Sequence, residues 1–282
     1  LVDEGMKIKA RLKRGEKNFS DLEGKSAVTL FYENSTRTRC SFDLAAKNLR
    51  VNVVNLGVAT SSVQKGETLI DTGRTLDMQQ NDFMVIRHPV AGAPNLLAKN
   101  VKAHVINAGD GMNEHPTQAL LDFLTMKEHF GKLDGLRVAI LGDVSHSRVA
   151  KSNLFGLKKL GSEVRLFAPR TLLPTDIGKM GAKVCAFREE AVEGADVVMG
   201  LRIQLERQRA GAFPSLGEYA KYYGVNDEIL RLADKDAIVM HPAPVNRGVE
   251  LTSSVIDGEQ SRIEEQVFSG LAVRMAVFKA LA

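Results

Sequence analysis

A short polar run that directly follows an apolar segment is the part of the chain best suited to chemistry. Residues 35–39 read STRTR, and apolar side chains then recur at Phe42, Ala45, Ala46 and Leu49. This i, i+3, i+4, i+7 spacing predicts one face of a helix that begins within the run. Backbone N–H groups at a helix start, with hydroxyls and two arginines beside them, suit an anion such as phosphate. A helix that is merely well capped by one of the hydroxyls explains the run equally well.

Other polar groups also follow apolar segments. Arg87 and His88 end one such segment, and His115 and Gln118 flank Pro116, a residue favoured at the first position of a helix. His115 and Gln118 could both donate to a carbonyl group. Taken singly, each of these residues fits a surface or structural role as well as a functional one.

Three further polar segments lie in the second half of the chain. Residues 142–148 (GDVSHSR) match a dinucleotide-binding fingerprint only loosely, because the G-x-G-x-x-G spacing is missing. Arg202 and Gln204 follow the apolar segment 197–201, and residues 241–244 (HPAP) form a rigid segment whose carbonyl groups could accept hydrogen bonds. Together these segments add arginines to the set that a multiply charged anionic substrate would need.

The elements that must position these residues are short apolar strands that alternate with helical patterns. The predicted strands are residues 27–32, 51–56, 83–87, 101–107, 138–141, 163–167, 183–187, 197–201 and 238–240. Such alternation predicts parallel sheets covered by helices on both faces. In open α/β sheets, ligands bind beyond the carboxyl ends of the strands. The polar segments fall at those ends, so we expect them to form the site.

The strands fall into two series, which predicts two doubly wound parallel-sheet α/β domains joined by helices, with the active site in the cleft between them. A helical pattern over residues 116–129, followed by Gly131, lies between the series and marks the boundary. The domains are therefore expected at residues 1–131 and 132–261. The last stretch is also helical and could pack on either half.

Composition excludes several classes of protein. Hydrophobic residues make up 44% of the 282 residues and charged residues 26%, unlike a disordered chain. No apolar run approaches the ~18 residues of a membrane-spanning helix, and no signal peptide is recognised, so we expect no membrane association. The two cysteines, Cys40 and Cys185, are too few for a disulfide framework or a four-cysteine zinc site. They favour a reducing, cytoplasmic environment.

The charge balance admits more than one reading. Lys and Arg number 38 and Asp and Glu 34, a net charge of +4. This excess fits a nucleic-acid surface, a site for an anionic small molecule, or simply solubility. The cations between Lys7 and Lys17 are expected to face water at the end of a helix that is already under way at Leu1. Against nucleic-acid binding, no known nucleic-acid-binding module is recognised.

Considered together, the motifs resemble the transcarbamoylase family. They are STRTR at 35–39, RHP at 87–89, HPTQ at 115–118, Arg148, RIQ at 202–204 and HPAP at 241–244, and they occur in the family's order over nearly the whole chain. The resemblance implies transfer of the carbamoyl group of carbamoyl phosphate to the amine of L-aspartate in pyrimidine biosynthesis. It implies no cofactor and no metal. It also assigns carbamoyl phosphate to domain 1–131, with helix 262–282 packed back on it, and aspartate to domain 132–261.

The resemblance further implies a role for each matching residue. The phosphate would be bound by Ser35, Thr36, Arg37 and Thr38. The carbamoyl oxygen would be held by Thr38, Arg87 and His115. The carbamoyl NH2 would be bound by Gln118 and by the backbone carbonyls of Pro242 and Ala243. Those that would bind aspartate are Lys65, Arg148, Arg202 and Gln204.

Two implied roles concern assembly and closure of the domains. Ser61 and Lys65 would reach into the neighbouring subunit's site, which implies a homotrimer with shared active sites. Glu33 would pair with Arg148 and Arg207 in a closed state. The resemblance leaves open whether regulatory chains or other pathway enzymes attach to the trimer.

The implied reaction needs no protein nucleophile, since the amine attacks the carbamoyl carbon itself. Arginines and a helix N-terminus can stabilise the tetrahedral oxyanion, and placing two polyanions side by side supplies much of the rate. Two alternatives stay open. An ornithine-type transcarbamoylase should carry an acidic partner and a Cys after the last histidine, where Pro242 stands here. A non-catalytic anion-binding paralogue would keep the fold without the reaction.

Overall fold

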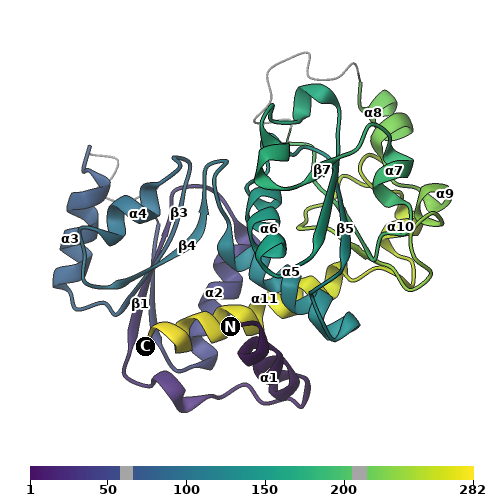
Figure 1. Ribbon diagram of the computed structural model, residues 1–282. Coiled ribbons are helices and arrows are strands. Elements are labelled where there is room, and N and C mark those ends of the chain that lie inside the picture. Colours follow the sequence, from purple (N-terminus) through teal and green to yellow (C-terminus); the bar gives the residue numbers. More distant parts are fainter. Residues whose placement is uncertain (58–65, 205–214) are drawn as a thin grey trace. The chain divides into compact units, whose positions relative to one another are not determined.

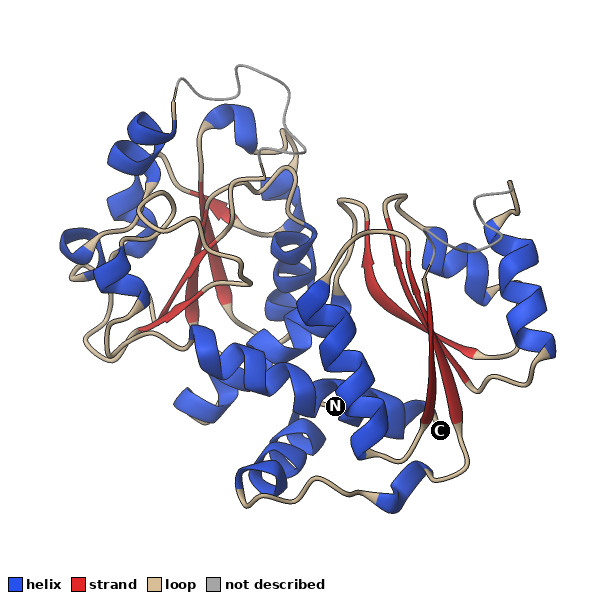
Figure 2. Ribbon diagram, turned by 180° about the vertical axis from the view of Figure 1, so that it is seen from behind, coloured by secondary structure: helices blue, strands red, loops and turns tan. Residues whose placement is uncertain are grey.

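The computed structural model describes residues 1–57, 66–204 and 215–282. The chain divides into two compact units, and each is a parallel sheet with helices packed on it (Figures 1 and 2). Unit 1 comprises Leu1–Leu124 and Phe268–Ala282, and unit 2 comprises Thr125–Val267. The chain passes from unit 1 to unit 2 within helix α5 (Pro116–Phe130) and returns within helix α11 (Ile263–Leu281).

The sheet of unit 1 has the strand order β2-β1-β3-β4, and every neighbouring pair is parallel. Its strands are β1 (Ser26–Phe31), β2 (Asn52–Leu56), β3 (Phe83–His88) and β4 (His104–Asp110). Its helices before α5 are α1 (Val2–Lys13), α2 (Thr36–Asn48), α3 (Leu69–Met78) and α4 (Ala93–Ala98), with a 3₁₀ turn at Ser20–Leu22. The chain leaves β1 toward β2 and then crosses back to β3. The switch point of this sheet, where ligands bind in such folds, therefore lies between β1 and β3.

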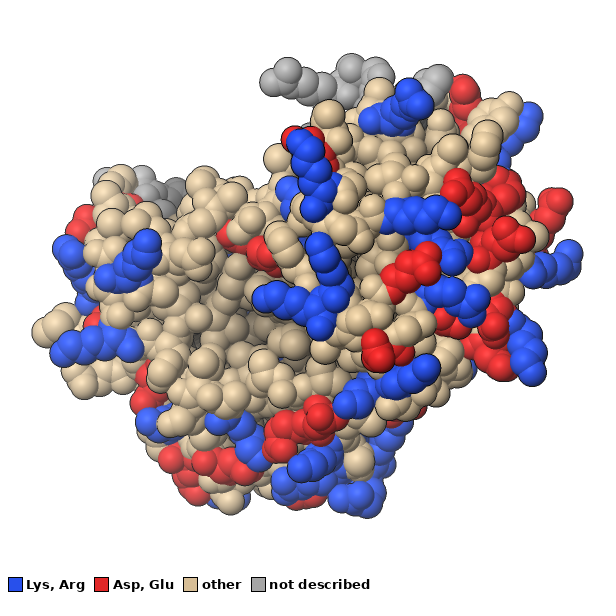
Figure 3. All heavy atoms as spheres, viewed as in Figure 1, with Lys and Arg blue, Asp and Glu red and all other residues tan. Residues whose placement is uncertain are grey.

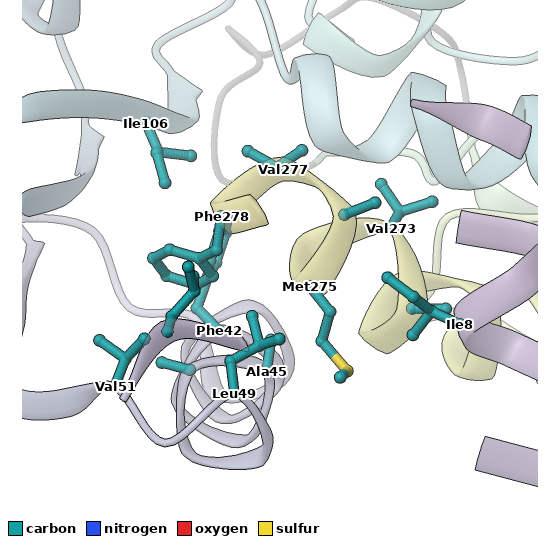
Figure 4. Close-up of a cluster of buried hydrophobic side chains, with 14 of the residues drawn as sticks. Ile8, Phe42, Ala45, Leu49, Val51, Ile106, Val273, Met275, Val277 and Phe278 are labelled. Atoms are coloured by element: carbon teal, nitrogen blue, oxygen red, sulfur yellow. The ribbon is translucent and has the colours of Figure 1, made fainter. Parts of the chain in front are cut away.

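Both faces of this sheet are buried, which explains why its central strands read as continuous apolar runs. On one face, Ala27 and Phe83 meet a cluster that draws on α1, α2, α5 and α11. Figure 4 shows part of this cluster, including Phe42 and Phe278. The ring of Phe278 of α11 lies 5.1 Å from that of Phe83 and 6.1 Å from that of Phe42 between centroids, both edge to face. On the other face, alternate strand residues meet α3 and α4. The C-terminal part of α11 is thus core of unit 1.

The sheet of unit 2 has the order β7-β6-β5-β8-β9, again all parallel. Its strands are β5 (Arg137–Leu141), β6 (Glu163–Phe167), β7 (Lys183–Val184), β8 (Val197–Gly200) and β9 (Ile238–Met240). Its helices are α6 (Arg148–Lys159), α7 (Arg188–Val192), α8 (Leu216–Tyr223), α9 (Asp227–Leu230) and α10 (Ser253–Ile256), with 3₁₀ turns at Arg170–Leu172 and Ile177–Met180. Its switch point lies between β5 and β8. The predicted doubly wound parallel α/β class is confirmed for both units.

Two expectations about burial in unit 1 are wrong. Residues 51–56 were predicted as a strand of a sheet covered on both faces and hence as buried, but β2 is an edge strand of mixed exposure and its Val54 is 58% exposed. Lys9, expected to face water with its neighbouring cations, is buried: its Nζ donates to Ser269 Oγ at 2.9 Å and lies over the ring of Phe268. In both cases the environment is set by segments far away in the sequence.

Charged side chains of both signs are intermixed over unit 2 on the face that Figure 3 shows. Most of the ion pairs described within unit 2 lie at least partly in water, such as Arg247 with Asp257. Among the helices of the described residues, none has the length and apolar character needed to cross a membrane.

Candidate active site

The first candidate segment lies at the switch point of unit 1. Strand β1 ends at Phe31, and α2 begins at Thr36 with Ser35 as its N-cap residue. The Ser35 hydroxyl makes no capping hydrogen bond, so the expected side-chain cap is not formed by the residue at that position. Thr38 is buried, whereas Thr36 and Arg37 are exposed. The first-turn N–H groups of a helix have no acceptor within it, and with the positive end of the helix dipole they suit an anion.

Arg87 lies across the switch point from this segment. It is the register partner of Phe31, and its carbonyl oxygen accepts a hydrogen bond from Tyr32 N at 2.9 Å. Its Nε donates to Glu33 Oε2 at 3.2 Å, and the two side chains are 14% and 18% exposed. Glu33 was expected to pair with arginines of the second domain. In this structure it holds Arg87 in its own unit, a pair that the sequence did not indicate.

His115 and Gln118 begin α5, and a buried carboxylate organises the loop before them. Asp110 accepts hydrogen bonds from Gly92 N, Asn107 Nδ2, Asn113 Nδ2 and Glu114 N at 2.7–3.1 Å. Burial alone would raise the pKa of Asp110, but these hydrogen bonds outweigh it and lower the pKa below its usual value. The loop that leads to His115 is therefore fixed.

The backbone of the same loop is tightly packed against the end of β3. Gly111 has φ +53°, and its N–H donates to His88 O at 2.8 Å. A Cβ at this position would lie 2.7 Å from Pro89 O, so only glycine fits. Further along, His115 O accepts hydrogen bonds from Gln118 N and Ala119 N as α5 begins, and both His115 and Gln118 are buried.

A buried polar network lies behind Gln118. Gln118 Nε2 donates to Asp122 Oδ1 at 3.0 Å, one turn along α5. Arg274 of α11 is attracted to Asp122, donates to Ser41 Oγ of α2 at 2.8 Å, and lies over the ring of Phe42. Burial lowers the pKa of Arg274 to about 10, which leaves it cationic at neutral pH. Sequence reasoning missed Asp122 and Arg274. The signal was a lone cation within the apolar run LAVRMAVF of the last helix.

The switch point of unit 2 brings the turn after β5 against the segment after β8. Gly142 has φ +129°, and a Cβ there would lie 2.6 Å from Leu201 O. Leu201 N donates to Leu141 O at 2.7 Å. Arg148 is the first residue of α6 and is buried, and Ser147 caps the helix by accepting from Ala150 N at 3.1 Å. Only glycine permits this close approach, which places the segments of Arg148 and Arg202 at one switch point.

Asp143 holds the two segments of this switch point together. Its Oδ1 lies 2.7 Å from His146 Nδ1, and its Oδ2 accepts from Gln204 N at 3.4 Å. Gln204 Nε2 in turn donates to His146 O at 3.0 Å. The GDVSHSR segment and the RIQ segment, matched separately in the sequence, are therefore hydrogen-bonded to each other. The Asp143–His146 pair was not predicted.

The segments after β8 and β9 are held by a second buried carboxylate. Glu250 accepts from Ile203 N at 2.8 Å and from Asn246 N and Nδ2 at 2.8 and 2.7 Å, and its burial raises its pKa. After β9, Ala243 N donates to His241 Nδ1 at 2.9 Å, and Ala243 has φ +51°. The backbone that carries the Pro242 and Ala243 carbonyls is thereby fixed.

Three predicted site residues, Ser61, Lys65 and Arg207, lie outside the described residues. Within the ranges that the structure describes, no group of three or more His, Cys, Asp or Glu side chains could hold a metal ion. The arginines, hydroxyls and helix N-terminus described above suit the binding of anions.

Two family models match this chain. The model described as "Aspartate/ornithine carbamoyltransferase, carbamoyl-P binding domain" matches residues 1–128, and "Aspartate/ornithine carbamoyltransferase, Asp/Orn binding domain" matches residues 134–281. The chain belongs to this family. The resemblance that the motifs carry is thereby confirmed, and the protein is a carbamoyltransferase.

Curated relatives agree with this assignment. The aspartate carbamoyltransferase catalytic subunit of Ruminiclostridium cellulolyticum is 58% identical over 281 residues, which is 100% of this chain and 90% of the relative. The catalytic subunit from Acetivibrio thermocellus is likewise 58% identical over 281 residues, with the same shares of each chain.

Solved carbamoyltransferases share the fold. Aspartate transcarbamoylase from Trypanosoma cruzi, in complex with N-(phosphonacetyl)-L-aspartic acid, has a TM-score of 0.88 at 34% identity, covering 99% of this chain and 90% of that one. Ornithine carbamoyltransferase from Thermus thermophilus has a TM-score of 0.86 at 27% identity, covering 99% and 94%. Since both branches share the fold, the choice of acceptor depends on the residues of the site.

Proposed function

We propose that this carbamoyltransferase transfers the carbamoyl group of carbamoyl phosphate to the amine of L-aspartate, giving N-carbamoyl-L-aspartate and phosphate. The observation that carries the proposal is the position of the motifs at the switch points of the two sheets. Residues 35–38 and Arg87 flank the switch point of unit 1, and Arg148 and Arg202 flank that of unit 2. Relatives named aspartate carbamoyltransferase catalytic subunit match the whole chain.

Unit 1 supplies most of the groups proposed to bind carbamoyl phosphate. The phosphate is bound at the N-terminus of α2 by Ser35, Thr36, Arg37 and Thr38, where hydroxyls, a guanidinium group and the helix dipole favour negative charge. The carbamoyl oxygen is held by Arg87, His115 and the Thr38 hydroxyl.

Unit 2 supplies the groups proposed to bind aspartate, apart from Lys65. Arg148 and Arg202 bind the two carboxylates, and Gln204 assists; its main chain is fixed by Asp143. An ornithine acceptor would instead present a second amine, which two arginines would repel. Pro242 follows His241 where an ornithine-type site would carry Cys, and this too favours aspartate.

The reaction follows from these contacts. The deprotonated amine of aspartate attacks the carbamoyl carbon, and the tetrahedral oxyanion gains charge opposite Arg87, His115 and Thr38. Gln118 and the carbonyls of Pro242 and Ala243 accept from the carbamoyl NH2. The C–O bond to phosphate then breaks, and the leaving phosphate takes the proton of the amine. We propose that no metal or cofactor takes part.

We further propose that the enzyme is a cytoplasmic homotrimer in which Ser61 and Lys65 serve the neighbouring subunit's site. A hybrid experiment tests this arrangement. Subunits inactivated by Lys65→Ala and subunits inactivated by Arg87→Ala are mixed, dissociated and reassembled. Some sites in the reassembled protein then combine an intact Arg87 from one subunit with an intact Lys65 from its neighbour. Recovery of activity in the mixture, absent from either variant alone, is expected. Unchanged inactivity after verified exchange would exclude a shared site.

The acceptor is tested by comparing the two amines directly. Carbamoyl phosphate is incubated with the protein and either L-aspartate or L-ornithine, and the carbamoylated product is identified by mass spectrometry. Carbamoyl aspartate alone is expected. Citrulline as the main product would overturn the proposed acceptor, and absence of any carbamoylated product would favour an anion-binding paralogue.

A further inference from the structure

The buried network behind Gln118 bears on how the carbamoyl group is oriented. A primary amide has an accepting end, Oε1, and a donating end, Nε2, and the two are similar in shape. The carbamoyl NH2 is a donor, so a Gln118 that binds it must present Oε1. A flipped amide would set the Nε2–H group of Gln118 against the N–H of the carbamoyl group, and two donors cannot hydrogen-bond to each other. Nothing within Gln118 itself prefers one orientation.

Asp122 supplies that preference. Its Oδ1 accepts from Gln118 Nε2 at 3.0 Å, and Asp122 is completely buried. An ionised carboxylate only accepts hydrogen bonds, so the flipped amide would set Oε1 against a negative oxygen. The two residues are one turn apart on α5, which keeps their side chains on one face of the helix.

Arg274 provides the charge that a buried carboxylate needs. It is itself buried and attracted to Asp122, and its Nη1 donates to Ser41 Oγ on α2, the helix whose N-terminus is proposed to bind phosphate. Burying a lone carboxylate is costly, and a buried cation offsets this cost. The network therefore ties the first turns of α5 to α2.

We propose that Asp122, supported by Arg274, is a positioning residue that fixes the Gln118 carboxamide with Oε1 toward the carbamoyl NH2. This inference rests on the proposed function, because it assigns Gln118 to the carbamoyl group. Asp122 itself does not touch the substrate. Its effect on the rate is transmitted through the orientation of one amide.

A double-mutant cycle tests the proposal. Asp122→Asn keeps the shape but can accept or donate, so the amide loses its preferred orientation. We expect kcat for carbamoyl aspartate to fall about 10- to 100-fold, the size of effect expected when one buried hydrogen bond is left mispaired. The Kd of inorganic phosphate should change by less than about threefold, because the phosphate contacts lie on α2. In a Gln118→Ala background the same substitution should cost less than about threefold in kcat.

The control is Asp82→Asn, which alters a carboxylate that accepts from Ser26 N at the opposite end of β1. It should leave kcat unchanged. The inference is overturned if Asp122→Asn lowers kcat equally in the parent and in the Gln118→Ala background. It is also overturned if the affinity for phosphate falls in proportion to kcat, since either result would mean a general structural role. A parent protein that forms no carbamoyl aspartate would instead defeat the proposed function, and with it this inference.

A second variant covers the case in which Asp122→Asn does not fold. In Gln118→Glu the introduced carboxyl would face Asp122 on α5, with His115 one turn earlier. Arg274 of α11 supplies positive charge beside Asp122 and is itself repelled by Arg87 of β3. Only the protonated form of the introduced carboxyl can donate to Asp122 and still present an acceptor. Its kcat relative to the parent should therefore rise as the pH falls from 8 toward 6, by about tenfold. A ratio that does not vary with pH would contradict the role of Asp122.

Discussion

Glu33 and Arg87 form an ion pair at the carboxyl ends of neighbouring strands, with 3.2 Å between Oε2 and Nε. The pair is mostly shielded from water, so it orients the guanidinium group before any substrate arrives. It also places a negative charge at the switch point where α2 is proposed to bind phosphate. Glu33 thus has two opposite effects, since it positions a cation and repels an anion.

We predict that Glu33→Gln tightens phosphate binding. Removing the carboxylate removes its repulsion of a nearby anion, which should lower the Kd of inorganic phosphate about three- to tenfold. Isothermal titration calorimetry at fixed ionic strength measures this effect. Glu23→Gln, which breaks an exposed pair with Arg50, is the matched control and should leave the Kd unchanged. Weaker phosphate binding in Glu33→Gln would show that positioning of Arg87 outweighs repulsion.

Arg87→Ala and His115→Ala should each lower kcat by about 10²–10³, the usual effect of losing one donor to a developing oxyanion. Steady-state kinetics with saturating aspartate measures the change. Arg74→Ala removes an arginine of the same unit whose Nη2 donates to Asn100 Oδ1 at the surface, and it should keep the parent's kcat. An Arg87 or His115 variant within about threefold of the parent would remove that residue from the proposed mechanism.

Sequence alone located most of the strands because their apolar runs are local signals. Residues 163–167 and 238–240 were predicted as strands and form β6 and β9 with those bounds. The extent of 183–187 was overestimated, since β7 pairs only through Lys183 and Val184 at the sheet edge. The burial of Lys9 could not be predicted, because it depends on Ser269, 260 residues later in the chain.

The candidate site shows the same difference between features with a local sequence signal and features that depend on distant residues. Residues in motifs, such as Arg87 and Arg148, could be nominated from spacing and resemblance. Asp122 could not, because a carboxylate inside a helical pattern usually faces water. Its charged partner is Arg274 of α11, which the end of the chain brings to the first unit. Supporting groups are thus harder to predict than the residues they support, since their partners carry no fixed spacing.

The acceptor site of unit 2 can be probed separately from the donor site. Arg148→Ala and Arg202→Ala should each raise the KM for aspartate about 10- to 100-fold, because each removes charge-assisted hydrogen bonds to a carboxylate. The Kd of inorganic phosphate should be unaffected, which separates binding of aspartate from general damage.

Arg247→Ala is the control for these two variants, since it removes an arginine of the same unit that forms an exposed pair with Asp257. Its KM for aspartate should match the parent's. A comparable increase in KM for all three variants would indicate a nonspecific effect of removing positive charge, and the assignment of Arg148 and Arg202 would be wrong.

The hydrogen bonds of Asp110 make a testable contribution to stability. They lower its pKa in the folded protein below the ordinary value of 3.8, so the folded state favours the ionised form. This contribution is complete above about pH 5 and is lost as the pH falls through 3.8 toward the lowered pKa. In Asp110→Asn, the NH2 group of the side-chain amide would face backbone N–H groups that donate to a carboxylate oxygen in the parent protein. The free energy of unfolding at pH 7 should therefore fall by about 1–3 kcal/mol.

Urea denaturation of parent and variant between pH 3 and pH 7 measures the difference. The difference in the free energy of unfolding between parent and variant should narrow as the pH falls below about 4, because protonation then removes the ionised Asp110 carboxylate from the parent as well. Asp176→Asn, at an exposed carboxylate, should match the parent throughout. Since Asp110 also fixes the loop that carries His115, Asp110→Asn should lower kcat at a temperature where it is fully folded. A difference in stability that stays constant down to pH 3 would show that Asp110 acts through its shape rather than through its charge.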